Sequence, residues 1–274
     1  MFKEILENVN SKTPLVHSIT NYVTVNDCAN ILLACGASPI MADDLNEVED
    51  ITSICNGLVI NIGTLNERTI QSMLKAGKKA NELSHIVVLD PVGAGASALR
   101  TSTTFQLLKK VRFSVVRGNI SEIKTVALGS GTTKGVDADV SDTVTENNLD
   151  EAVSFAKALS AKTGSIIAIT GAIDIVADSK KAYVIRNGNA LMSKITGTGC
   201  MLTCVIAAYC SANPDKLLDA TAAAVCVMGL CGELAHEKLL KTEAGTSTYH
   251  SYIIDFMSKM NAELLHGGMK VEIR

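Results

Sequence analysis

One local pattern recurs along the chain and limits the folds open to it. A short apolar run ends in a polar residue or glycine, and a stretch with helical spacing follows. Four such runs lie at residues 57–63, 85–90, 113–116 and 165–170. Strands without interspersed polar residues are buried on both faces of a sheet, and helices between them are the crossovers that parallel strands require. The pattern therefore predicts an α/β protein, a three-layer α/β/α sandwich with a mostly parallel central sheet.

The remaining segments add helices and one hairpin to this sheet. Residues 174–177 and 182–186 are expected to pair as a hairpin. Helices are expected at residues 66–84, 146–163, 200–211, 215–240 and 246–265. Two more are expected between them, one that ends at Lys110 and one that starts from a cap at Asn119 or Ser121. The polar residues 129–145 are expected to form an exposed loop. No linker or internal repeat divides the chain, so we expect one domain over residues 1–274.

Composition excludes several classes of protein. Apolar residues make up 47% of the chain and charged residues 19%, which is enough for a core and rules out intrinsic disorder. A net charge of −3 without a run of Lys and Arg argues against nucleic acid. The apolar stretches 200–212 and 220–232 are shorter than the roughly 20 residues of a membrane span. The eight cysteines show no paired metal spacing, and we expect reduced thiols in a cytoplasmic protein.

Polar residues and glycines follow the predicted strands, at the edge where open parallel sheets bind ligands. They are Asn61, Gly63, Asp90, Gly93, Gly95, Arg117, Asn119, Glu122, Thr170 and Gly171. Two carboxylates that suit Mg²⁺, beside an Arg that suits phosphate oxygens, indicate nucleotide or phosphoryl chemistry. The alternative is that Asp90 and Glu122 cap helices and that Arg117 forms a surface ion pair.

The segment 194–200 (KITGTGC) stands immediately before an apolar helix that starts near Met201. Glycines allow a sharp turn that aims successive N–H groups at one point, and a helix N-terminus adds partial positive charge. Such an anion hole suits a transferring phosphoryl group. We expect Gly199 to need a positive φ in this turn.

Two other glycine motifs are weaker. Residues 129–135 (GSGTTKG) have the wrong spacing for a P-loop, and Gly follows the Lys where Ser or Thr is required. Residues 93–98 (GAGASA) fit a loose dinucleotide fingerprint, but the next strand ends in Arg117 where an NAD site would carry an acidic residue.

Six segments in order along the chain resemble the hydroxyethylthiazole kinase family, the thiamine-salvage members of the ribokinase-like superfamily. They are residues 17–23 (HSITNYV), 38–42 (SPIMA), 89–94 (LDPVGA), 117–122 (RGNISE), 170–171 (TG) and 195–200 (ITGTGC). The resemblance implies a ribokinase-like fold. It also implies phosphorylation of the alcohol of 4-methyl-5-(2-hydroxyethyl)thiazole with ATP as co-substrate and Mg²⁺ as cofactor.

The resemblance also implies roles for individual residues. Those carried over are Arg117 and Thr170 for ATP, Met41 and Gly197 for the thiazole, Asn21 and Val23 as neighbours in that pocket, Asp90 and Glu122 for the metal and phosphates, and Cys200 with Gly197 and Gly199 for catalysis. Superfamily members outside this family usually carry Asp where this chain has Cys200, so whether the thiol is a base or only orients the hydroxyl stays open. For His17 we favour a structural role.

The family resemblance further implies a homotrimer with the thiazole site shared between subunits, and the weakly charged composition is compatible with that. A kinase for hydroxymethylpyrimidine or a nucleotide-dependent hydrate dehydratase is the alternative within the fold, although those relatives typically carry Asp at the last position of the glycine turn. A nucleotide-sensing module without turnover is the alternative outside enzymology.

Overall fold

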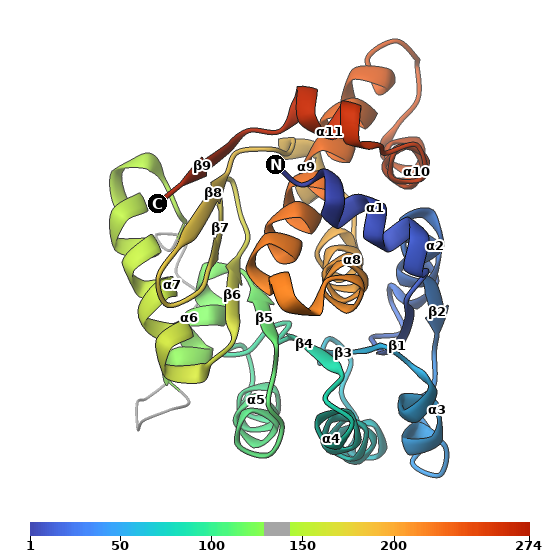
Figure 1. Ribbon diagram of the computed structural model, residues 1–274, viewed down its shortest axis with the longest axis vertical. Helices are drawn as coiled ribbons and strands as arrows, with labels where there is room; N and C mark the ends of the chain where they lie inside the picture. The colour runs from blue at the N-terminus through green and yellow to red at the C-terminus, as the bar shows by residue number, and fades with distance from the viewer. Residues whose placement is uncertain (129–142) are drawn as a thin grey trace.

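The computed structural model describes residues 1–128 and 143–274. Within these ranges nine strands form one sheet in the order β2-β1-β3-β4-β5-β6-β7-β8-β9 (Figure 1). The strands are β1 (Leu15–Ile19), β2 (Ser38–Ile40), β3 (Gly57–Asn61), β4 (Ile86–Asp90), β5 (Val115–Gly118), β6 (Ile166–Ile169), β7 (Asp174–Ala177), β8 (Ala182–Ile185) and β9 (Val271–Ile273). The first six pair in parallel, and β6 to β9 pair antiparallel. The predicted mostly parallel sheet is therefore confirmed.

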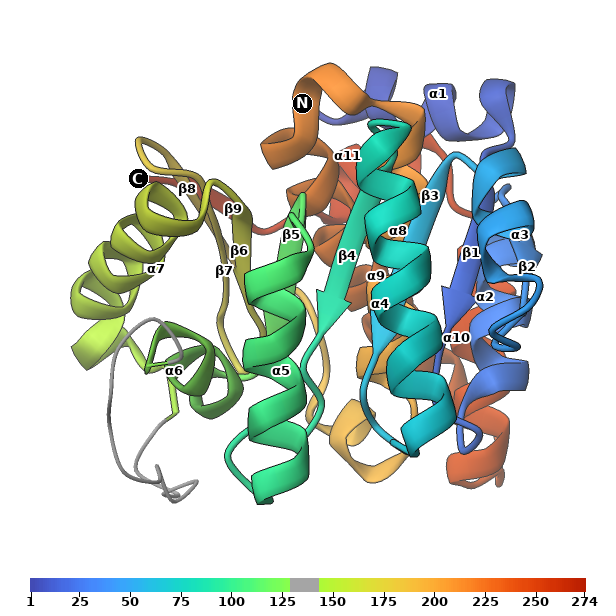
Figure 2. The ribbon, with the colours of Figure 1, turned by 90° about the horizontal axis from the view of Figure 1, so that it is seen from below.

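Helices cover both faces of this sheet, so the predicted three layers are confirmed. One face carries α1 (Lys3–Lys12), α2 (Val25–Ala34), α8 (Thr198–Ala212), α9 (Leu217–Leu239), α10 (Thr246–Ser258) and α11 (Ala262–Gly268). The other carries α3 (Val48–Ile54), α4 (Glu67–Glu82), α5 (Ala98–Lys110), α6 (Ile120–Leu128) and α7 (Leu149–Thr163). Figure 2 shows α4 and α5 in front of the strands and α8 and α9 behind them. Each face has its own apolar core, as expected for strands buried on both sides.

The helix α9 is long and apolar enough to cross a membrane by length and composition alone. Its residues from Ala220 to Gly232 are all buried, and it packs against α8, α10 and the strands β6 to β8. Its apolar surface is therefore used within the core.

Two boundaries differ from the expectation. The third predicted strand, residues 113–116, starts and ends two residues later as β5, so Arg117 lies within the strand. The helix expected over residues 246–265 is broken, because Asn261 caps a second helix by accepting the N–H groups of Glu263 and Leu264. Most of the loop predicted at residues 129–145, and the motif at 129–135, fall outside the described residues.

Candidate active site

The carboxyl ends of the middle strands surround one cavity. The register pairs Asn61 with Asp90 at the ends of β3 and β4, and Gly118 with Ile169 at the ends of β5 and β6. A cavity of about 720 Å³ opens beside them, a size within the usual range of ligand sites. The sequence-predicted residues that line it are Asp90, Arg117, Asn119, Glu122, Thr170, Gly171, Gly197, Gly199 and Cys200. The strand-end rule therefore predicted where this cavity lies.

Arg117 is held by groups from three elements. Its Nη2 donates a hydrogen bond to Thr170 Oγ1 over 2.7 Å, and its Nη1 lies 3.5 Å from Asp90 Oδ2. The third group is Gly199, on which a Cβ would lie 2.7 Å from Nη1 and 2.8 Å from Nη2. Arg117 lines the cavity, and its side chain is only 13% exposed, so the alternative of a surface ion pair is wrong.

Asp90 is completely buried at the floor of the cavity. Its Oδ2 accepts hydrogen bonds from Asn61 Nδ2 at 2.9 Å and from Thr203 Oγ1 at 2.8 Å, whereas its Oδ1 has no partner. Burial raises the pKa of Asp90 to about 6, against the lowering effect of Arg117 and with a further raising effect from Glu122. The carboxyl group is thus fixed in orientation and keeps one oxygen free.

Glu122 has a structural task as well as a place in the cavity lining. Its Oε2 accepts the N–H of Asn119 at 2.8 Å, and Asn119 Oδ1 accepts the N–H of Glu122 at 2.8 Å. This reciprocal pair is a capping box at the start of α6. The other oxygen, Oε1, accepts the N–H of Gly93 at 2.8 Å. The cap interpretation is therefore confirmed for Glu122, which still lines the cavity.

The glycine turn leads into the N-terminus of α8. Gly197 is the N-cap with φ +90°, so the positive φ that the sequence suggested for Gly199 falls at Gly197 instead. Gly199 already belongs to the first helical turn, and the space it leaves is filled by the Arg117 guanidinium. The first N–H groups of a helix have no intrahelical acceptor. Residues Thr198 to Cys200 therefore present such donors at the cavity wall.

Cys200 lies where these donors meet the strand ends. Its Sγ accepts hydrogen bonds from Asn21 Nδ2 at 3.2 Å and from Asn61 Nδ2 at 3.3 Å. Burial, and then the nearby charge of Asp90, raise the pKa of the Cys200 thiol. It is the one cysteine of the eight that is not buried, and all eight are free thiols.

None of the residues of the N-terminal motifs 17–23 and 38–42 lines this cavity, so the predicted site residues Asn21, Val23 and Met41 all lie outside its lining. Met41 is half-buried against the core, and the Val23 side chain is exposed. His17 is buried and uses both ring nitrogens, with Nε2 2.8 Å from the Ala42 carbonyl and Nδ1 3.0 Å from Thr52 Oγ1. The structural role expected for His17 is confirmed, and it holds the backbone beside Met41.

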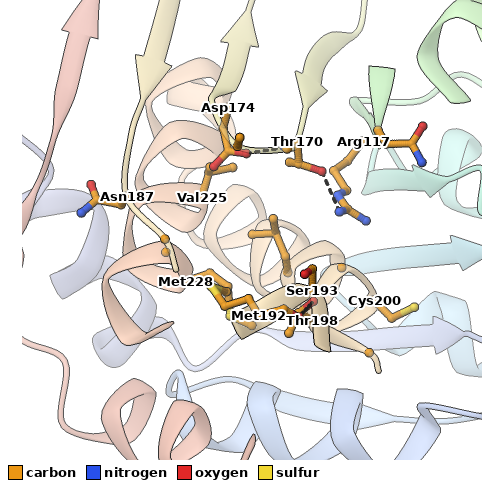
Figure 3. A pocket seen from close by; sticks show the side chains of 18 of the residues that line it. Arg117, Thr170, Asp174, Asn187, Met192, Ser193, Thr198, Cys200, Val225 and Met228 are labelled. Carbon is orange, nitrogen blue, oxygen red and sulfur yellow. Dashed lines mark hydrogen bonds between the residues drawn. The ribbon is translucent and has the colours of Figure 1, made fainter. Parts of the chain in front are cut away.

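Sequence reasoning missed the far end of the cavity. Figure 3 shows Asp174 beside Thr170 and Arg117, with Asn187, Met192 and Met228 further along. Asp174 Oδ1 accepts the N–H of Gly171 at 2.9 Å, and burial raises the pKa of this carboxyl to about 7. The sequence does contain one signal that Asp174 belongs to the cavity, because this charged residue starts a strand that is otherwise apolar (DIVA).

No group of three or more His, Cys, Asp and Glu side chains suited to a metal occurs among residues 1–128 and 143–274. The cavity instead combines a mostly buried Arg, the three carboxylates of Asp90, Glu122 and Asp174, and the N-terminus of a helix on one edge of the sheet. Guanidinium and helix N–H groups bind phosphate oxygens. The arrangement can therefore receive an anion with several oxygens next to a thiol.

Comparisons with known proteins agree on one family. A model described as the hydroxyethylthiazole kinase family matches residues 6–263. A hydroxyethylthiazole kinase of Clostridium acetobutylicum is 64% identical over 272 residues, which are 99% of either chain. One of Methanobrevibacter smithii is 42% identical and covers 98% of this chain and 96% of its own.

Solved structures show the same relationship. A structure of a hydroxyethylthiazole kinase protein from Pyrococcus horikoshii OT3 covers 100% of this chain and 98% of its own, with a TM-score of 0.87 and 34% identity. A ribokinase-like superfamily protein from Enterococcus faecalis V583 is 15% identical, covers 94% of this chain and 95% of its own, and has a TM-score of 0.61. The second likeness shows the fold alone, and it confirms the predicted ribokinase-like architecture.

Proposed function

The chain belongs to the hydroxyethylthiazole kinase family, and on that premise we propose that it transfers the γ-phosphoryl group of ATP to the hydroxyl of 4-methyl-5-(2-hydroxyethyl)thiazole in thiamine salvage. The observation that carries the proposal is the position of Arg117, buried between Thr170 and the glycine turn on the wall of the cavity. A guanidinium without a full set of partners beside free helix N–H groups suits a polyphosphate.

Each residue has a physical task in this reaction. Arg117 and Thr170 hold the phosphates of ATP, and the N–H groups of Thr198 to Cys200 stabilise the charge that develops on the transferring group. The alcohol oxygen forms a bond to the γ-phosphorus while the bond from that phosphorus to the bridging oxygen of ADP breaks. Cys200 Sγ holds the acceptor hydroxyl. Gly197 contacts the thiazole together with Asn21, Val23 and Met41, which lie outside the cavity lining within this single chain.

We propose Asp90 and Glu122 as the groups that hold Mg²⁺. The free Oδ1 of Asp90 is a buried oxygen without a partner, and two carboxylates together with phosphate oxygens and water are a usual Mg²⁺ environment. When bound, the ion supplies positive charge to the phosphate oxygens. The positions of the two carboxylates are already fixed by Asn61, Thr203 and backbone N–H groups, so little reorganisation accompanies binding.

We also propose that the enzyme is a cytoplasmic homotrimer with the thiazole site at a subunit boundary. Tyr22 and Val23, next to Asn21, expose 79% and 57% of their surface, and a large apolar residue at such a place favours an interface. The eight free thiols are consistent with a reducing compartment. Light scattering should give three times the chain mass of 28.9 kDa. The mass of a monomer would contradict the shared site.

Substrate assays test the reaction itself. The protein is incubated with Mg-ATP and either hydroxyethylthiazole, hydroxymethylpyrimidine or pyridoxal, and ADP and the phosphorylated product are followed. We expect turnover with the thiazole. Preferred turnover of hydroxymethylpyrimidine would favour the alternative within the fold, and nucleotide binding without any product would favour a sensing module.

Calorimetry tests whether ATP and the thiazole bind to different sides of the cavity. Arg117→Ala and Thr170→Ala should weaken ATP binding more than thiazole binding, whereas Asp90→Asn should reduce turnover roughly tenfold or more with melting unchanged or raised. An equal loss of affinity for both ligands in folded Arg117→Ala protein would contradict the assignment of ATP to this side.

A further inference from the structure

The amide of Asn61 has all of its hydrogen-bonding groups in use, and its orientation is therefore fixed. Its Oδ1 accepts the N–H of Gly63 at 2.9 Å and Asn21 Nδ2 at 3.2 Å. Its Nδ2 donates to Asp90 Oδ2 at 2.9 Å and to Cys200 Sγ at 3.3 Å. A flipped amide would set an oxygen against the Asp90 carboxylate and an NH₂ against the N–H of Gly63. Nδ2 must therefore face Cys200.

Asn21 is fixed in the same way from the other side. Its Oδ1 accepts the N–H groups of Val23 and Thr24 and the hydroxyl of Thr24, each at 3.1 Å. Its Nδ2 is left to donate to Asn61 Oδ1 and to Cys200 Sγ. Both amides are buried, with 1% exposure for Asn61 and 4% for Asn21. The two side chains bond to each other and to the Cys200 sulfur, so they form one rigid pair beside the thiol.

Close packing leaves this pair no other arrangement. A Cβ on Gly63 would lie 3.0 Å from Asn21 Cβ and 3.0 Å from Asn61 Oδ1, so the glycine is what allows the two amides to meet. The sulfur of Cys200 receives two N–H donors from behind, and Cys200 also lines the cavity. A sulfur that accepts two N–H groups keeps one further position, an S–H bond or a lone pair, for another partner.

We propose that Asn61, together with Asn21, is a positioning residue for phosphoryl transfer, which orients the Cys200 sulfur toward the acceptor hydroxyl and ties it to the Asp90 carboxyl. This inference rests on the proposed function, because it assigns the acceptor hydroxyl to the Cys200 side of the cavity. Through one NH₂ group, Asn61 connects the phosphate side of the site to the acceptor side. Loss of that group should disturb the reacting geometry more than the binding of either substrate.

A thiol-labelling experiment tests the contact without any kinase reaction. Cys200 in the substrate-free protein is alkylated with iodoacetamide at pH 8, and mass spectrometry measures its rate in wild-type protein and in Asn61→Ala. N–H donors stabilise a thiolate, so their loss should slow alkylation roughly threefold or more. A side chain that served only packing would expose the thiol when removed, so an unchanged or faster rate overturns the proposal.

Steady-state kinetics test the role in turnover. Asn61→Ala and Asn21→Ala should each lower kcat roughly tenfold, and Asn61→Ala, at a residue without a thiazole contact, should have a smaller effect on the KM of the thiazole. In the Cys200→Ala background the Asn21→Ala loss should fall to about twofold or less, because its target is gone. Equal losses in both backgrounds, or changes in KM alone, overturn the proposal.

Asn213→Ala is the matched control. Asn213 is a buried amide at the opposite end of α8, bonded to the carbonyls of Ile5 and Tyr209, and it does not line the cavity. Its removal should lower stability and leave kcat and the alkylation rate unchanged. If wild-type protein fails to phosphorylate the thiazole, the proposed function is wrong, and the labelling result still decides whether the amides hold the sulfur.

Discussion

A single methyl group at position 199 should displace the Arg117 guanidinium, to which we assign the binding of ATP. In Gly199→Ala the new Cβ would lie 2.7 Å and 2.8 Å from the terminal nitrogens of Arg117 and 3.1 Å from its Cζ. These distances are too short, and the Arg117 head is the part that can move. It would leave its hydrogen bond to Thr170 and its ion pair with Asp90.

The expected magnitude follows from the interactions that a displaced Arg117 can no longer make. A hydrogen bond to a charged group contributes about 1.5–3 kcal/mol, so misplacing Arg117 should lower kcat/KM for ATP between roughly tenfold and a little over a hundredfold. The fold should be unaffected, because Gly199 lies in a helix without a positive φ and Ala is favoured over Gly there by about 0.5–1 kcal/mol. Activity and stability should thus change in opposite directions.

A double-mutant cycle with Arg117→Ala checks this reasoning. Initial rates against ATP concentration are measured for wild-type protein, for each single variant and for the pair, with melting temperatures alongside. If the methyl group acts by displacing Arg117, Gly199→Ala should cost almost nothing once Arg117 is Ala. An undiminished loss in that background would mean that Gly199 serves the backbone N–H groups instead, and our account of its role would be wrong.

Five further substitutions test backbone strain, a buried charge and the role of the thiol. Gly197→Ala should lose about 1–2 kcal/mol of stability in denaturant titrations because φ is +90°. It should also lose activity, because the new Cβ would lie 3.0 Å from Thr24 Cγ2. Gly164→Ala, at φ +73° with no atom near the new Cβ, should lose stability through the same backbone strain and keep its activity. Asp174→Asn should be more stable than wild-type protein, since a pKa raised to about 7 makes the folded state lose stability as pH rises from about 4 to 7. Its advantage should grow by at most about 1.4 kcal/mol per pH unit in that window and stay constant above it, and a pH-independent difference would exclude the charge as cause. Cys200→Ala should keep part of the turnover and Cys200→Asp most of it, because helix N–H groups remain and a carboxylate accepts the alcohol proton; a dead Cys200→Ala enzyme would assign the chemistry to the thiol.

The sequence could predict the middle of the sheet because those strands are continuous apolar runs with amphipathic helices between them. Asn61 and Asp90 end two such runs, and the parallel register brings them side by side. The strands β2 and β9 have three residues each, too few for any periodicity, and they exist through pairing with β1 and β8. Their place depends on contacts between distant segments, which local pattern does not contain.

Within the site, residue type was easier to predict than the task of each residue. Glu122 suits both a metal and a helix cap, and only its distances to Gly93 and Asn119 show that its oxygens already serve backbone N–H groups. Asp174 begins an otherwise apolar strand, and that single charge is the one local signal that the cavity extends to it. The motif KITGTGC likewise marks a turn into a helix without saying which glycine takes the positive φ.

Gly197 and Gly199 are each needed for a different reason, although the sequence shows them as parts of one motif. Gly197 meets a backbone requirement, since no β-carbon is tolerated without strain at φ +90°. Gly199 meets a side-chain requirement set by a residue far earlier in the chain, because Arg117 from β5 reaches the first turn of α8 only where no Cβ stands. The helix position that offers N–H groups to a phosphate is therefore also the one that admits the guanidinium, so both positive groups can face the same oxygens.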